Sequence, residues 1–135
     1  MLAFALTVPD GAAFAWVLAG TTGYALGAVL WCVVLAVRSR TNVLLADLDP
    51  GALDSPQVRM LEESLTALFQ AFVLITAVAL AALGATLAFT GTAPAWTAAV
   101  LLLTGAAAAT WLLRTGDVIP AVLYLPILLL GLTLV

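Results

Sequence analysis

The chain has 135 residues, of which 65% are apolar and only 8% are charged, and its mean hydropathy is +1.25. Water-soluble domains carry about a quarter charged residues, so the composition excludes an ordinary soluble domain and indicates a polytopic membrane protein embedded in the lipid bilayer. The net charge of −3 argues against nucleic-acid binding.

The absence of histidine and lysine, together with the single cysteine, excludes several kinds of site. The chain has no histidine, and all four basic residues are arginines, so it offers no histidine ligand for a metal or haem and no lysine for a Schiff base. Cys32 alone allows no internal disulfide or cysteine-held cluster. We therefore expect no metal site and no cofactor. The exclusive use of arginine is typical of GC-rich genomes and favours a prokaryotic or viral source.

The first predicted membrane span covers residues 12–37, which is more than the roughly 20 residues that cross the hydrocarbon core. It carries a stripe of small residues at every fourth position: Gly11, Ala15, Ala19, Gly23 and Gly27. Such a stripe lets another backbone approach closely, which favours helix association in lipid. It predicts packing either within the same chain or against a second copy in a homo-oligomer.

The segment 38–65 holds most of the polar side chains and is predicted to form a loop followed by a helical extension. Ser55 and Pro56 are typical of a helix start, as the N-cap and the first helical residue. The helix predicted from Pro56 to Phe89 is about 51 Å long at 1.5 Å per residue. It therefore exceeds the hydrocarbon thickness. Residues 66–89 form the second span, and the charged residues before them are expected to project into water.

Two further spans are predicted at residues 94–113 and 118–135, separated by a short turn. Pro126 lies inside the last one and predicts a kink. Short turns make neighbouring helices antiparallel, so the predicted fold is all-α, an up-down-up-down four-helix transmembrane bundle in a single domain.

The tryptophans and arginines predict how this bundle is oriented. Trp16 and Trp96 fall at one end of the spans and Trp31 and Trp111 at the other, as in aromatic belts at both membrane interfaces. All four arginines fall on one side, which the positive-inside rule assigns to the cytoplasm. Residues 38–65 are then cytoplasmic, and both termini are outside.

Ionisable groups are absent from the predicted spans, whereas pumps and transporters usually carry them, and no catalytic residue is evident. Asp47, Asp49 and Asp54 resemble part of a calcium loop, but Gly51 comes one residue early and Val58 stands where a bidentate acid is needed. A solvated loop is the better interpretation.

The arginines are the candidate ligand-binding residues. They fall at one end of the bundle, where they predict a cytoplasm-side cleft for an anionic ligand or a lipid head group: Arg38, Arg40, Arg59 and Arg114. The alternative is that Arg59 forms ordinary helix-surface pairs with Glu62 and Glu63, which are worth about 0.3 kcal/mol each. Tyr124 supplies a hydroxyl that needs a partner.

The layout resembles the MAPEG family, the membrane-associated proteins of eicosanoid and glutathione metabolism. Arg38–Val43 and Asp47–Pro50 are similar to the stretch after the first span in bacterial members. The family's helix-two pattern is Arg-x-x-x-Asn-x-x-Glu; registered on Arg59, this chain has Glu63 and Thr66 at the second and third positions. One of three signature residues therefore matches.

The resemblance implies a trimeric enzyme that conjugates or isomerises lipophilic substrates with glutathione. Arg59 would then bind the ligand, supported by Arg38, Arg40 and Tyr124.

The absence of intramembrane charges beside a small-residue stripe favours another function. We expect a non-catalytic structural or accessory subunit that acts through helix packing in a homo-oligomer, a larger membrane complex or a viral membrane. A MAPEG-like glutathione- or lipophile-binding enzyme is the first alternative, and a small pore or holin-like protein is a lesser one.

Overall fold

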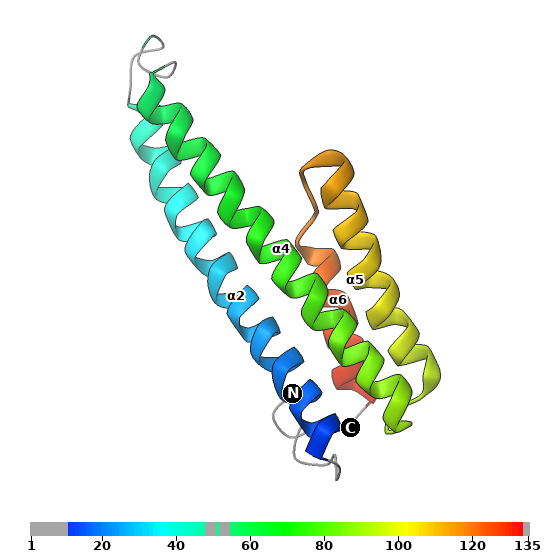
Figure 1. Ribbon diagram of the computed structural model, residues 1–135. Helices are drawn as coiled ribbons and strands as arrows, with labels where there is room; N and C mark the ends of the chain where they lie inside the picture. Colours follow the sequence, from blue (N-terminus) through cyan, green and yellow to red (C-terminus); the bar gives the residue numbers. More distant parts are fainter. Residues whose placement is uncertain (1–10, 48–50, 52–54, 134–135) are drawn as a thin grey trace.

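The computed structural model describes residues 11–47, 51 and 55–133. These residues are all-helical, with no strand among them, as the sequence predicted (Figure 1). Three of the helices are long and apolar enough to cross a membrane, which indicates an integral membrane protein. The helices are α2 (Gly11–Ala46), α4 (Pro56–Thr90), α5 (Ala95–Thr115) and α6 (Ala121–Thr133).

Helix α2 continues well beyond the first predicted span. The prediction of a loop beginning at Arg38 is wrong for residues 38–46, because these residues form the last turns of α2. This stretch contains no glycine or proline to stop the helix, and arginine is a good helix former. Thr41 is buried and Leu45 is half-buried. The first charged residue thus marks the end of the apolar span but not the end of the helix.

Helix α4 begins and ends at the signals that its sequence carries. The Ser55 hydroxyl accepts a hydrogen bond from the Val58 backbone N–H at 3.4 Å, and Pro56 is the first helical residue, as predicted. At the other end Gly91 adopts a left-handed conformation, with φ 63°, and its N–H donates to the Leu87 carbonyl at 3.1 Å. With 35 residues, α4 is about 52 Å long.

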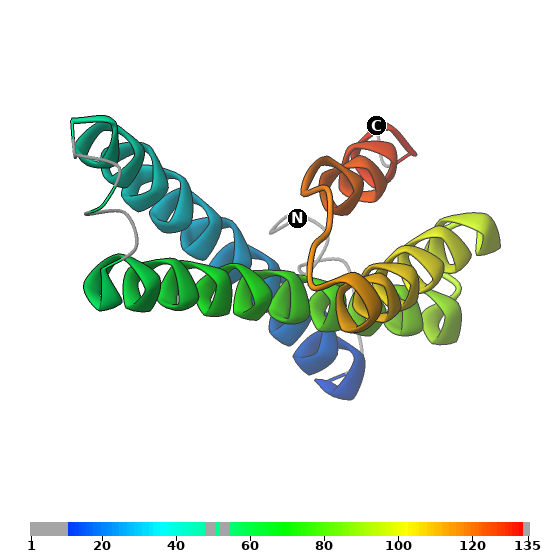
Figure 2. The same ribbon diagram turned by 90° about the horizontal axis from the view of Figure 1, so that it is seen from above.

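Helix α4 is the centre of the molecule because it packs against α2 on one face and against α5 on another. Figures 1 and 2 show α2 running beside α4 and crossing it at an angle, while α5 lies along the later part of α4. Helix α6 packs mainly against α5.

Each packed face of the helices repeats every three or four residues, the spacing found in coiled coils. On α2 the buried positions are Val17, Gly20, Gly27, Val34 and Thr41, and the half-buried Tyr24 and Trp31 lie between them at the same spacing. On α4 one buried row is Phe72, Thr76, Ala79 and Leu83, and a second row is Val73, Ala77, Leu80, Gly84 and Leu87. On α5 the buried row includes Ala98, Leu101, Gly105, Ala108 and Leu112.

Glycines set the closest helix contacts. A methyl group added at Gly105 of α5 would lie 2.7 Å from the Ala77 carbonyl oxygen of α4. One added at Gly84 of α4 would lie 2.9 Å from the Ala98 carbonyl oxygen of α5. These two glycines therefore let the α4 and α5 backbones touch.

The turn between α5 and α6 is longer than predicted, so the fourth helix begins later in the sequence. Gly116, with φ 73°, ends α5 two residues later than predicted, and the Asp117 carboxylate accepts from the Val118 N–H at 2.8 Å. Helix α6 begins at Ala121 and not at residue 118, because Pro120 disfavours a helical conformation at the residue before it. Its 13 residues span about 20 Å, less than the hydrocarbon core. Pro126 lies inside α6, and the kink there stays a prediction.

Candidate functional site

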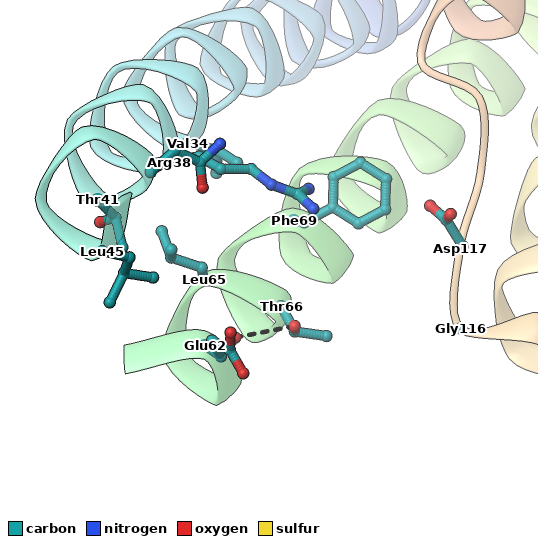
Figure 3. A pocket seen from close by; sticks show the side chains of 11 residues that line it. Val34, Arg38, Thr41, Leu45, Glu62, Leu65, Thr66, Phe69, Gly116 and Asp117 are labelled. Carbon is teal, nitrogen blue, oxygen red and sulfur yellow. Dashed lines mark hydrogen bonds between the residues drawn. The ribbon is translucent and has the colours of Figure 1, made fainter. Parts of the chain in front are cut away.

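A cleft opens where α2, α4 and the α5–α6 turn meet (Figure 3). Its volume is about 360 Å³. We call it the Arg38 cleft. It is lined by Val34, Arg38, Thr41, Asn42 and Leu45 of α2, by Glu62, Leu65, Thr66 and Phe69 of α4, and by Gly116 and Asp117 of the turn.

The packing of α2 on α4 explains where this cleft begins. At Gly27 the two helices are in close contact, since an added methyl group would overlap the Thr76 hydroxyl. One turn further along, Trp31 stacks on Phe72 with ring centroids 5.2 Å apart. Trp31 also packs against Phe69, at 5.9 Å. These rings fill the seam, and beyond them the same face of α2 presents Arg38 to the cleft.

The Arg38 cleft brings together charges of both signs from three elements. Figure 3 shows the Arg38 side chain extending from α2 toward Phe69, with Glu62 on α4 and Asp117 on the turn at other sides of the cleft. Within the described part of the chain, Arg38 and the Glu62 carboxylate form no ion pair or hydrogen bond. The lining carries one positive and two negative groups, so the cleft suits a ligand that has both an anionic and a cationic end.

Arg59 lies in a neighbouring, shallower cleft. That cleft is lined by Arg59, Glu62, Glu63, Thr66, Ala67 and Gln70 of α4. Glu62 and Thr66 line both clefts, so the two adjoin each other. Arg40 and Arg114 are exposed and line neither cleft. The structure thus brings Arg38 and Arg59 to adjoining sites but does not gather the four arginines around one.

Tyr124 lies elsewhere, in contact with Tyr24. The two rings meet edge to face with centroids 5.9 Å apart, which ties α6 to α2. The Tyr24 hydroxyl is buried and has no hydrogen-bond partner within the described residues. Tyr124 does not line the Arg38 cleft.

The small-residue stripe divides between two surroundings. Gly23 and Gly27 face α4, where their nearest neighbours are Ala79 and Thr76. Gly11, Ala15 and Ala19 are exposed. The packed positions follow three-or-four spacing and include Gly20, where a methyl group would lie 2.7 Å from the Leu83 side chain. A strict four-residue period misses Gly20, whereas the coiled-coil spacing from Val17 would have found it.

An apolar groove runs beside the α2–α4 contact. Its sides are lined by Trp16, Ala19, Gly20, Gly23, Leu74, Ile75, Val78, Ala79 and Ala82. A second hollow continues it toward the ends of the helices, with Ala13, Trp16, Ala82, Ala85, Thr86, Phe89 and Thr90 as its lining. We call the two together the small-residue groove. Its walls expose almost no polar atoms.

Comparisons with known proteins found no match. No protein-family model matches the chain, and neither a curated protein nor a solved structure is significantly similar to it.

The described residues contain no group of three His, Cys, Asp or Glu side chains that would hold a metal ion. Asp49 and Asp54 of the predicted loop lie outside the described residues.

Proposed function

We propose that the chain is a non-catalytic integral membrane subunit that acts by packing its helices against a second copy of itself. The observation that carries this proposal is the small-residue groove. More than half of the residues that line the part of it beside the α2–α4 contact are small: Ala19, Gly20, Gly23, Ala79 and Ala82. In lipid, such surfaces allow close backbone approach and therefore favourable dispersion contacts, whereas hydrophobicity alone does not distinguish a helix from an acyl chain.

The exposed part of the stripe supports a homo-oligomer in particular. Ala15 and Ala19 are exposed on α2, and Ala19 also lines the groove, so two copies of α2 can meet through the same residues in a symmetric contact.

The proposed membrane topology is up-down-up-down, with α6 as a short fourth crossing and both termini outside. Arg38, Arg59 and the Arg114 turn lie toward the same end of the helices, and the positive-inside rule assigns that end to the cytoplasm. The α2–α4 pair extends past the α5–α6 turn in Figure 1. It then projects into the cytoplasm as a two-helix stalk.

Substituting leucine for Ala19 is expected to fill the groove and weaken self-association by tenfold or more. A leucine there holds the partner backbone away, and small-residue interfaces depend on that approach. Ala19 is exposed, so the protomer itself should keep its stability. The measurement is the dimerisation constant in bilayers, by energy transfer between labelled copies, together with a thermal melt.

Ala25→Leu is the matched control, because Ala25 is also exposed on α2 but lies outside the groove. It should associate like the wild type. Equal association of Ala19→Leu and the wild type, or a monomeric wild type at all protein concentrations, would contradict the proposal.

A glutathione-binding enzyme is the second candidate, favoured by the placement of Arg38 and Arg59 in adjoining clefts. Under this alternative, glutathione binds the purified protein in a calorimetric titration, and Arg59→Ala abolishes the heat. Arg40→Ala, outside both clefts, leaves it unchanged. A flat titration with the wild type removes this candidate.

A further inference from the structure

The Arg38 cleft lies at the depth where three apolar spans end together. The apolar run of α2 stops immediately before Arg38, and that of α5 stops before Arg114. On α4, Glu62 and Thr66 precede the uninterrupted apolar run that follows Gln70. The polar interfacial layers of a bilayer lie just outside its hydrocarbon core, so a cleft at this depth opens among lipid head groups.

The walls of the cleft combine apolar surface with charge. Val34, Leu65 and Phe69 provide apolar walls, which suit the glycerol and upper acyl region of a lipid. Arg38 presents a guanidinium, whose planar fork matches phosphate oxygens. Glu62 and Asp117 present carboxylates that accept hydrogen bonds from an ammonium group.

The balance of charge decides what kind of head group fits. One arginine faces two carboxylates, so a purely anionic ligand would meet net repulsion. A ligand with a phosphate at one end and a protonated amine at the other offers an anion to the arginine and a cation to the carboxylates. A quaternary ammonium has no N–H to donate, so its carboxylate contacts would be weaker.

We propose that the Arg38 cleft is a binding site for a phospholipid head group that carries a primary ammonium, with its phosphate on Arg38 and its ammonium between Glu62 and Asp117. The inference rests on the proposed insertion into a membrane but not on the proposed self-association. The site ties the α2–α4 stalk to the α5–α6 turn through the lipid.

The test is native mass spectrometry of the full chain, reconstituted with equimolar phosphatidylethanolamine, phosphatidylcholine and phosphatidylglycerol of identical acyl chains. We expect phosphatidylethanolamine to be retained preferentially. Arg38→Gln should lower retention of all three lipids about tenfold, which corresponds to about 1.4 kcal/mol, because each has a phosphate that the guanidinium binds. Arg40→Gln is the matched control and should change nothing, because Arg40 lies outside the cleft.

The carboxylate variants separate ligand binding from a purely structural effect. Glu62→Gln and Asp117→Asn should lower retention of phosphatidylethanolamine while phosphatidylglycerol retention stays the same or rises. A structural defect would lower all lipids together. Equal retention of the three lipids by the wild type, or equal effects of Arg38→Gln and Arg40→Gln, would overturn the proposal.

Free phosphoethanolamine distinguishes a lipid from a soluble ligand of the same chemistry. It should displace the lipid only at far higher concentration, because it lacks acyl chains. Displacement as effective as that by the lipid itself would overturn the assignment to a membrane lipid. Extraction of the protein from membranes by alkaline carbonate is measured separately: extraction would refute insertion and hence the proposed function, whereas insertion without lipid preference refutes only this inference.

Discussion

Replacing Gly105 with leucine is expected to separate α5 from α4 and to lower the free energy of unfolding by about 3 kcal/mol or more, the upper range for overpacked cores. Even a methyl group at Gly105 would lie 2.7 Å from the Ala77 carbonyl oxygen. The obstacle is backbone, so no side-chain rotation relieves it, and the helices have to move apart.

The gain in helix propensity is too small to offset this overlap. Removing a glycine from a helix interior stabilises it by about 1 kcal/mol at most. Separating α5 from α4 also loosens the contacts of Leu101 and Leu112, which are buried. Gly105→Ala should therefore destabilise the protein as well, but by less than Gly105→Leu.

Gly131→Leu is the matched control, because an added methyl group at Gly131 meets nothing within 4 Å. The measurement is reversible unfolding in detergent micelles, followed by helical circular dichroism. If Gly105→Leu and Gly131→Leu unfold at the same denaturant concentration, the close α4–α5 contact is not present in the folded protein.

The parts of the fold that sequence predicts well are those set by local chemistry. The start of α4 follows from Ser55 and Pro56, and its end lies one residue from the predicted one, because the next residue, Gly91, adopts a left-handed conformation. Such signals act over a few residues and do not depend on the rest of the chain.

The end of α2 shows where a local signal misleads. Arg38 marks the point at which the chain leaves the apolar layer, and the sequence suggested that the helix stops there. Helix formation depends on backbone conformation and side-chain packing, and both persist to Ala46, with Thr41 buried on the way. The residue at which the chain leaves the apolar layer is therefore not the residue at which the helix ends.

The buried face of each helix is poorly predicted by sequence, for a physical reason. In a soluble protein, hydropathy distinguishes the buried face, but in lipid both faces are apolar. Of the four-residue stripe, Gly23 and Gly27 lie against α4, whereas an added methyl group at Gly11 meets nothing within 4 Å. Steric fit places Gly20 of α2 against Leu83 and Gly105 of α5 against Ala77. This fit depends on two helices at once, so the sequence of one helix alone does not predict it.

The candidate cleft depends on contacts between distant parts of the sequence. Arg38 was a candidate from its charge, but Asp117 joins it only because the α5–α6 turn lies against the α2–α4 pair. The chemistry of Tyr124 suggests a place beside the arginines, but α6 places its ring against Tyr24. Charge identifies candidate residues, whereas helix packing decides which of them share a site.

The contact of Gly27 with Thr76 offers a second large effect, one that a compensating change should reverse. A methyl group at Gly27 would overlap the Thr76 hydroxyl, while the Thr76 Cβ lies 3.5 Å away, at ordinary contact distance. Gly27→Ala alone should therefore destabilise the α2–α4 contact by about 1–3 kcal/mol. Unlike Ala77 at Gly105, the obstacle here is a side-chain atom that mutation removes.

Thr76→Ala supplies that removal, and the single variant in the cycle measures its own cost, which includes the loss of the buried Thr76 methyl group. The Thr76 hydroxyl donates only to the Phe72 carbonyl of its own helix, at 2.8 Å, and such bonds to the preceding turn add little to helix stability. The double variant should recover most of the stability that Gly27→Ala loses, giving a coupling energy of about 1–2 kcal/mol between the two sites, within the range for residues in contact.

The measurement is a double-mutant cycle on the free energy of unfolding, with Gly105→Ala combined with Thr76→Ala as the control pair. That control should show additive effects, because the obstacle at Gly105 is a carbonyl oxygen of α4, which Thr76→Ala leaves in place. Additive effects for Gly27 and Thr76 would mean that Thr76 rotates away from α2, since threonine has two accessible rotamers in a helix. The Gly27 contact would then not set the distance between α2 and α4, and the aromatic packing of Trp31 on Phe72 would have to maintain it.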